Sequence, residues 1–336
     1  MTPGLPRPVL VIGEALVDVL VPPGGGRTAR PGGSPANVAL GLGRLGHRVR
    51  LATRIGDDPL GKEIHARLAG SGVALTDGSV TDGATSTATA RLDAGGSATY
   101  DFDIRWDPVP DAVLPAFTGV PNHLHTGSVA ATLRPGADLV LAAVREARGP
   151  ATVSYDPNLR PALLGSPAAE RSRVEQLVSL SDVVKASDED LAWLYPGRAP
   201  ADVAREWATG GPALVVLTLG GDGAHAYWRR GHVEVPGRRV DVVDTVGAGD
   251  AFMAGLLSGL MVRGLLGAGH GPGHGERARR TLDRATAGPL PAPELTAALS
   301  LAAGVAALTC TREGADPPTL ASLGQPLVNR GAGGAW

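Results

Sequence analysis

The sequence is poor in cysteine and lysine and almost balanced in charge. Its single cysteine, Cys310, excludes an internal disulfide and a cysteine-based metal site. Lys62 and Lys185 are the only lysines, and all other basic residues apart from histidine are arginines. The formal net charge is −2, so no bulk electrostatic attraction favours nucleic acid or an anionic membrane as a partner.

Long apolar runs are also missing. We find no run of about 18 apolar residues and therefore expect no membrane span. The apolar run near the amino terminus is short, and Glu14 and Asp18 interrupt it, which argues against a signal peptide. We therefore expect a cytoplasmic protein.

Short apolar runs alternate with amphipathic segments along most of the 336 residues. The runs are typical of buried strands, and the amphipathic segments are typical of helices that cover them. The alternation predicts one α/β domain over residues 1–336, with a central, mostly parallel sheet and helices on both faces. The expected strands are 9–13, 49–55, 123–128, 151–156, 183–187 and 213–220, and the expected helices are 34–46, 59–69, 135–148 and 168–179.

A polar hairpin departs from this alternation. Residues 85–92 and 98–103 show alternating patterns on either side of a glycine-containing turn at 93–96. Together with neighbouring segments they predict a small β-sheet lid, formed by about 15–31 and 85–105.

Residues 264–293 depart from it as well. Gly, Pro, Arg and His dominate this segment, which predicts a flexible surface insertion. His270 and His274 lie in a glycine-rich stretch without cysteine or carboxylate partners, so we predict no metal site there.

The stretch DTVGAGDAFMAGLL at 244–257 places two glycines and an acid at the start of an apolar helix. Gly247 and Gly249 allow positive φ and the close approach of a ligand to their N–H groups. The first N–H groups of a helix lack intrahelical partners and carry partial positive charge, so this turn predicts an anion site. Asp250 either caps the helix or accepts a proton from a hydroxyl that attacks a phosphoryl group.

A second glycine turn, GGSPAN at 32–37, opens another expected helix, with Ser34 as its expected cap. Asn37 lies one turn into that helix and offers both a donor and an acceptor to a sugar hydroxyl. Asp18 follows the first expected strand, and ligands of open α/β sheets bind at such strand ends. These residues are therefore candidates for binding a polar ligand.

Two more polar turns follow expected strands. SYDPNLR at 154–160 places Asp156, Asn158 and Arg160 just beyond one strand. TLGGDG at 218–223 is a glycine turn after another. The carboxyl ends of parallel strands meet at one edge of a sheet, so these turns are expected to contribute to the same site.

Together these stretches resemble the ribokinase-like sugar kinases, also called the PfkB carbohydrate kinases. Both family signatures are present, GGSPANVALGLGRLG at 32–46 and DTVGAGDAFMAGLL at 244–257. The similarity covers most of residues 9–263 and resumes at 306–318. GEALVD, IGDDPLG, TGSVAATLRPG and SYDPNLRP look most like bacterial fructokinases. The resemblance implies a ribokinase-like fold and ATP-dependent phosphorylation of a sugar hydroxyl, with fructose to fructose 6-phosphate as the expected reaction.

The resemblance also implies roles for individual residues. Asp250 is the implied base, and the N–H groups of Gly247, Ala248 and Gly249 are the implied anion hole. The implied sugar-binding residues are Asp18, Gly33, Asn37, Arg160 and Arg105. The implied nucleotide-binding residues are Lys185, Thr218, Gly220 and Gly223.

ATP and Mg²⁺ are the implied cofactors. Family members often bind a monovalent cation, such as K⁺, near the second signature, here around the backbone of Asp244, Val246 and Gly314. Relatives often dimerise through their β lids, so a homodimer is a further expectation.

The family motif Asn-x-x-Glu is replaced here by Ser187-Asp-Glu-Asp190, which leaves the Mg²⁺ ligands open. Two other functions also stay open. One is a 2-keto-3-deoxygluconate kinase or ribokinase on the same scaffold, and the other is a non-catalytic sugar-binding regulator.

Overall fold

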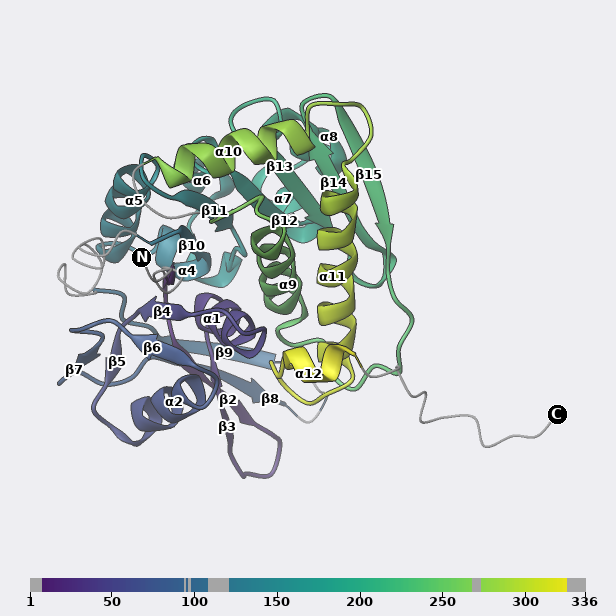
Figure 1. The fold of residues 1–336 in the computed structure, drawn as a ribbon. Helices are drawn as coiled ribbons and strands as arrows, with labels where there is room; N and C mark the ends of the chain where they lie inside the picture. The colour runs from purple at the N-terminus through teal and green to yellow at the C-terminus, as the bar shows by residue number, and fades with distance from the viewer. Residues whose placement is uncertain (1–7, 94, 96–97, 108–120, 268–272, 325–336) are drawn as a thin grey trace.

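A large sheet runs through the centre of the molecule (Figure 1). The computed structural model describes residues 8–93, 95, 98–107, 121–267 and 273–324. Within them the sheet has nine strands, in the order β15 (Gly231–Pro236), β14 (Gly223–Trp228), β13 (Leu214–Thr218), β12 (Val183–Ser187), β11 (Thr152–Asp156), β10 (His123–Gly127), β1 (Val9–Ile12), β4 (Val49–Ala52) and β6 (Val73–Leu75). Neighbours from β6 to β13 pair in parallel, and β14 is antiparallel to both β13 and β15.

Helices cover both faces of this sheet because successive side chains of a strand point in opposite directions. In β1, Val9 and Val11 belong to one core cluster, and Leu10 and Ile12 belong to the other. The first cluster includes residues of α1 (Ser34–Arg44), α2 (Pro59–Ala69), α9 (Ala248–Val262), α10 (His274–Ala285) and α11 (Pro293–Cys310). The second includes residues of α4 (Ser128–Thr132), α5 (Gly136–Ala147), α6 (Pro167–Leu180), α7 (Asp188–Leu194) and α8 (Pro200–Trp207). The predicted fold class is confirmed.

Helices α9 and α11 pack side by side (Figure 1). Helix α11 spans 18 residues with a mean hydropathy of 1.4, so by length and composition alone it could cross a membrane. The expectation that the chain has no such stretch is therefore wrong. Half of this helix is buried inside the protein, and a buried core helix meets the same criterion of length and composition.

A second sheet lies beside the first (Figure 1). Its four strands are β3 (Thr28–Gly32), β2 (Leu16–Val21), β8 (Thr87–Leu92) and β9 (Ala98–Asp103), in that order. β8 and β9 form the antiparallel hairpin predicted from the alternation, although residues 94, 96 and 97 of its turn lie outside the described residues. The strands come from the two segments expected to form a lid.

Two expected elements have different boundaries. The expected strand over 49–55 is divided, because β4 joins the large sheet and β5 (Ile55–Gly56) pairs separately with β7 (Val80–Thr81). In α1 the N-cap is Gly33, with a φ of 99°, and Ser34 is already the first helical residue. Ser34 is therefore not the helix cap, and its hydroxyl is used elsewhere.

The segment 264–293 differs most from its prediction. Its central part is helix α10, whose inner face carries His274, Ala278 and Leu282, all buried. These residues pack toward the large sheet because their spacing places them on one side of a helix. The prediction of a flexible insertion is wrong for residues 274–285, and residues 268–272 lie outside the described residues.

Candidate active site

The carboxyl ends of three central strands meet the first turn of α9 at one edge of the large sheet. A cavity of about 920 Å³ opens there, walled on its other side by the second sheet. This volume is typical of a site for a small molecule. Ala88, Ala90, Tyr100 and Phe102 of β8 and β9 contribute to the apolar wall.

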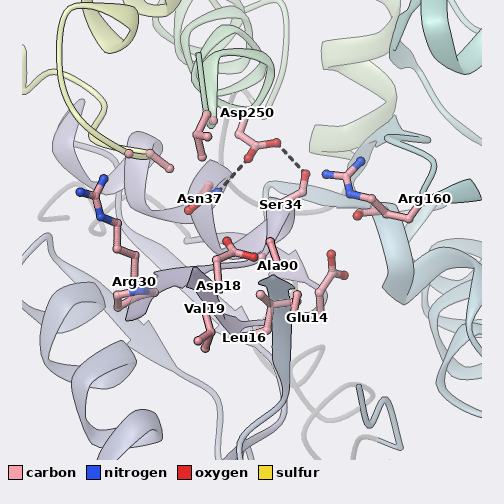
Figure 2. Close-up of a pocket in the computed structure, with 18 of the residues that line it drawn as sticks. Glu14, Leu16, Asp18, Val19, Arg30, Ser34, Asn37, Ala90, Arg160 and Asp250 are labelled. Carbon is pink, nitrogen blue, oxygen red and sulfur yellow. Dashed lines mark hydrogen bonds between the residues drawn. The ribbon is translucent and has the colours of Figure 1, made fainter. Parts of the chain in front are cut away.

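Asp250 lies in the first turn of α9, with its carboxylate among the side chains that line this cavity (Figure 2). Its Oδ1 accepts hydrogen bonds from the Ser34 hydroxyl at 2.7 Å and from Asn158 Nδ2 at 3.2 Å. Its Oδ2 accepts one from Asn37 Nδ2 at 2.9 Å. A carboxylate oxygen accepts two hydrogen bonds, so Oδ2 retains capacity for a further donor. These bonds come from other elements and the N-cap of α9 is Gly247, so the Asp250 side chain is held for a role other than capping its own helix.

Asn158 connects Asp250 to an arginine. Its φ of 36° is left-handed, a conformation that costs energy for a residue other than glycine and is common at functional sites. Nη1 of Arg160 donates to Oδ1 of Asn158 at 2.6 Å and to its carbonyl oxygen at 2.9 Å. The loop after β11 therefore supplies an amide donor to the Asp250 carboxylate and places a guanidinium group at one edge of the cavity.

The glycine turn before Asp250 is shaped by close packing. Gly247 is the N-cap of α9 with a φ of 73°, and a Cβ on it would lie 2.5 Å from the Cβ of Ala315. The N–H of Ala248 donates to the Thr245 carbonyl oxygen at 3.1 Å and closes the turn. The N–H of Gly249 belongs to the helix start, where no intrahelical acceptor is available. Gly249 is helical, so the positive φ expected there occurs only at Gly247.

Two more carboxylates line the cavity. Burial raises the pKa of Asp18 to about 6, although the Arg160 charge lowers it. The Asp18 side chain is accessible from the cavity, but the cavity walls surround it with protein. Its carboxylate is therefore less well solvated than one on the outer surface, which is why its pKa is raised. Burial raises the pKa of Glu14 to about 7, although its hydrogen bonds, including one from the Ala130 N–H at 2.9 Å, lower it. Both carboxyls are therefore suited to exchange protons near neutral pH.

Comparison with known proteins agrees with this geometry. Residues 9–321 match the family described as pfkB family carbohydrate kinase. A fructokinase from Klebsiella pneumoniae is 38% identical over 267 residues, which cover 76% of this chain and 85% of the relative. The chain belongs to the pfkB family of carbohydrate kinases.

Two solved structures extend the comparison. A fructokinase from Xylella fastidiosa with bound ATP has a TM-score of 0.77 and 28% identity, and the match covers 95% of this chain and 97% of that one. A double-mutant fructokinase from Vibrio cholerae, in a form with fructose, ADP and potassium ion bound, has a TM-score of 0.71 and 28% identity. That match covers 95% of this chain and 97% of the other.

Most residues predicted for the sugar and phosphate side of this carbohydrate kinase meet at the cavity. Figure 2 shows Asp18, Asn37, Arg160 and Asp250 around it. Its lining also includes Gly33, Gly247, Asp244, Val246 and Gly314. Residues up to about 300 positions apart in the chain are thus brought together, as an open α/β sheet requires.

Other predicted residues do not line this cavity. Arg105 lies beyond β9, where its backbone N–H donates to the Ser86 hydroxyl and its guanidinium pairs with Asp103 at 3.6 Å. Arg105 is not among the residues that line the cavity, so its contact with sugar stays a prediction. Thr218, Gly220 and Gly223 form the turn between β13 and β14, outside the lining, and Gly220 and Gly223 have positive φ.

Lys185 is also outside the lining and is buried in the middle of β12. Its Nζ is 3.0 Å from Oδ2 of Asp156. Within the protein its ammonium group thus meets a buried carboxylate, and its contact with nucleotide phosphates stays a prediction.

The Ser187–Asp190 pair does not fit a Mg²⁺ site. The Ser187 hydroxyl accepts from the Asp190 N–H, and Oδ2 of Asp190 accepts from the Ser187 N–H at 3.0 Å, which is a capping box for α7. Oδ1 of Asp190 accepts from the Leu159 N–H at 2.7 Å. Among the described residues, no group of three or more His, Cys, Asp or Glu side chains is placed to hold a metal.

Asp244 joins the two segments expected around a monovalent cation. Its Oδ1 accepts from the Val246 N–H at 3.0 Å, and its Oδ2 accepts from the Gly314 N–H at 2.8 Å. These two bonds hold the turn at 244–246 against Gly314, so the residues predicted around a monovalent cation lie together.

Sequence reasoning missed three contributors to the site. It described Ser34 as a cap and Asn158 as a polar turn residue, but both bind Asp250. It treated Glu14 only as an interruption of an apolar run. The signal for Glu14 was its place directly after a buried strand, where ligands of open α/β sheets bind.

Proposed function

We propose that this carbohydrate kinase transfers the γ-phosphoryl group of ATP to a hydroxyl of fructose, giving fructose 6-phosphate and ADP. The observation that carries the proposal is the Asp250 carboxylate, which lines the cavity, is fixed by three side-chain donors and keeps acceptor capacity on Oδ2. The fructokinase from Klebsiella pneumoniae and the ATP-bound fructokinase from Xylella fastidiosa support the substrate assignment.

In the proposed reaction Asp250 takes the proton of the attacking hydroxyl. The sugar oxygen forms a bond to the γ-phosphorus while the bond from that phosphorus to the leaving ADP oxygen breaks. Phosphoryl transfer of this type depends on positioning and charge stabilisation, so one well-held carboxylate suffices as base. The hydrogen bonds from Ser34, Asn37 and Asn158 provide this positioning.

The turn before Asp250 and Arg160 stabilise the charge that spreads over the transferred phosphoryl group. The proposed donors are the N–H groups of Gly247, Ala248 and Gly249, and Ala248 must exchange its bond to Thr245 for this role. Arg160 lines the same cavity, and its guanidinium reaches the sugar or the phosphoryl group. Asp18, Gly33 and Asn37 are the proposed sugar-binding residues.

The nucleotide site is proposed at the turn containing Thr218, Gly220 and Gly223. ATP is expected as its Mg²⁺ complex, in which the metal neutralises phosphate charge. A K⁺ ion near Asp244, Val246 and Gly314 is part of the proposal, supported by the potassium-bound fructokinase from Vibrio cholerae.

The second sheet is proposed to act as a lid. It already forms one wall of the cavity, and closing it would exclude water, whose attack on ATP is the competing reaction. We further propose a homodimer formed through this sheet and a cytoplasmic location, with no nucleic acid or membrane partner.

The test is a coupled ADP-release assay with Mg²⁺-ATP and K⁺ against fructose, ribose, 2-keto-3-deoxygluconate, tagatose and adenosine. We expect fructose to give the highest kcat/KM, and Asp250→Asn to lose the activity while remaining folded. A higher kcat/KM with ribose or 2-keto-3-deoxygluconate would replace the substrate. A sugar that raises Tm without being phosphorylated would support the binding-regulator alternative and contradict the proposal.

A further inference from the structure

A buried ion pair lies below the first turn of α9. Nζ of Lys185, on β12, is 3.0 Å from Oδ2 of Asp156, on the adjacent strand β11. The two side chains are only 4% and 1% exposed. Apart from Lys185, no group within the described residues is placed to donate to the Asp156 oxygens, so Lys185 is the group that compensates this carboxylate.

Burying a charged pair of this kind in a protein core has a large cost in free energy. Removing two charges from water costs several kcal/mol per ion, and an apolar pair of similar volume is often equally stable or more stable. The chain has only two lysines, and the other one, Lys62, forms an exposed pair with Asp57 at the same 3.0 Å distance. Stability alone therefore gives no reason for a charged pair at the buried position.

The position of Lys185 suggests a reason. A Cβ placed on Gly249 would lie 3.2 Å from Lys185 Nζ, so the ammonium group lies beside the turn that precedes Asp250. Gly249 is helical and has no positive φ, so backbone conformation does not require a glycine there. The absence of a side chain at Gly249 leaves room for Lys185.

The ammonium group is charged in this environment. Burial alone would lower the pKa of Lys185, but the carboxylates of Asp156, Asp190 and Asp250 raise it above its usual value. A fixed positive charge in a poorly solvated position acts over several ångströms with little screening. It also has the same sign as the partial charge at the N-terminus of α9.

We propose that Lys185 and Asp156 form a positioning pair for phosphoryl transfer. Asp156 holds Lys185 beside Gly249 of the Gly247–Gly249 turn, and the Lys185 charge reinforces that turn as an anion site. This inference rests on the proposed kinase function, because the charge acts only when a phosphoryl group reaches the turn.

The first test exploits the two lysines directly. Protein labelled with ¹³C and ¹⁵N in lysine gives one buried and one exposed side-chain signal. We expect Mg²⁺-ADP with aluminium fluoride and fructose to shift the Lys185 signal and leave that of Lys62 unchanged. A Lys185 signal that stays in place while backbone amides of α9 report ligand binding would overturn the inference.

The second test compares the two lysine–aspartate pairs. In Lys185→Met/Asp156→Asn both charges are removed together, so no unpaired buried charge remains. We expect kcat to fall about tenfold to a hundredfold, with KM values changed less than about threefold. The loss of kcat is smaller than the roughly 10²- to 10³-fold loss for a donor in direct contact, because Lys185 acts through the turn. Lys185→Arg, which retains the charge, should recover part of the loss. The matched control is Lys62→Met/Asp57→Asn, whose kcat should equal that of the wild type.

The outcomes separate the two proposals. If the wild type phosphorylates a sugar and a folded double variant retains its kcat, the positioning role is wrong and the kinase function stands. If the wild type phosphorylates none of the tested sugars, the proposed function fails and this inference fails with it. If the double variant does not fold, the lysine signals in the wild-type protein still decide the matter.

Discussion

The two sheets of this protein bring residues to one cavity in different ways. In the large sheet, β1, β10 and β11 are buried along their whole length, and the side chains of the site follow at the strand ends or on adjoining helices. In the small sheet, β2 and β8 are partly exposed, and side chains within the strands, such as Asp18 and Ala90, face the cavity. The large sheet therefore fixes the base, and the small sheet forms a wall.

This difference suggests a division of work. Asp250 and its partners are held by long-range hydrogen bonds in a packed core, so changes there should alter the chemical step. Residues of the small sheet touch the cavity from a surface with fewer buried contacts, so changes there should alter binding. Four predictions test this comparison.

The largest effect on the kinetics is expected when an aspartate is changed to asparagine, once at Asp250 of α9 and once at Asp18 of the small sheet. Asp250→Asn removes the proposed base and should lower kcat about 10³-fold. Asp18→Asn removes a charged acceptor on the small sheet and should raise KM for the sugar about tenfold, with little change in kcat. Steady-state kinetics on both variants, with circular dichroism to check folding, measure the difference. Equal losses of kcat would contradict the division.

The second prediction concerns stability. Leu124 is fully buried in β10, so Leu124→Ala should lower the free energy of unfolding by about 2–5 kcal/mol. Leu20 of β2 is 43% exposed, so Leu20→Ala should lower the free energy of unfolding by no more than about 0.5 kcal/mol. Urea denaturation of both leucine-to-alanine variants gives the two values. A large loss for Leu20→Ala would show that the small sheet is part of the core.

The third prediction is a pH effect on binding. Because the pKa of Asp18 is raised to about 6, its ionised form dominates above that pH and is lost as the pH falls through it. KM for the sugar should therefore rise about tenfold between pH 7 and pH 5, since protonation removes a charged acceptor. Asp18→Asn should lose this part of the profile. Glu14, whose pKa is raised to about 7, leaves a separate effect near neutral pH that the variant retains.

The smallest effect on stability is expected from an ion pair between the small sheet and the segment that follows α11. Arg30 of β3 pairs with Glu313 at 2.9 Å, but both side chains are largely exposed. Arg30→Gln should change the unfolding free energy by less than about 1 kcal/mol. Arg44→Gln is the comparison, because Arg44 of α1 is better buried and binds both Asp316 and the Pro317 carbonyl oxygen at 2.6 Å. A greater loss from Arg30→Gln than from Arg44→Gln would reverse the expected order.

The sequence by itself determined the local parts of this protein. The apolar runs predicted the buried strands of a parallel sheet, because a strand covered on both faces needs apolar side chains in both directions. The run DTVGAGDAF predicted an anion-binding helix start with an acid beside it, since glycine freedom and unpaired N–H groups are local properties. Asp18, Asn37 and Arg160 followed from their places near strand ends and helix starts.

Only the tertiary structure decided which distant residues support them. Ser34 and Asn158 bind Asp250 across 216 and 92 positions of the chain, and no local pattern encodes such a meeting. The same holds for Lys185, which the sequence suggests as a phosphate contact and which is buried against Asp156. It holds too for the bond that Asp190 accepts from the Leu159 N–H. Helix α10 was obscured by the glycines and prolines around it. Local patterns fix local conformation, whereas strand order and side-chain packing fix the partners of each polar group, and these depend on the whole chain.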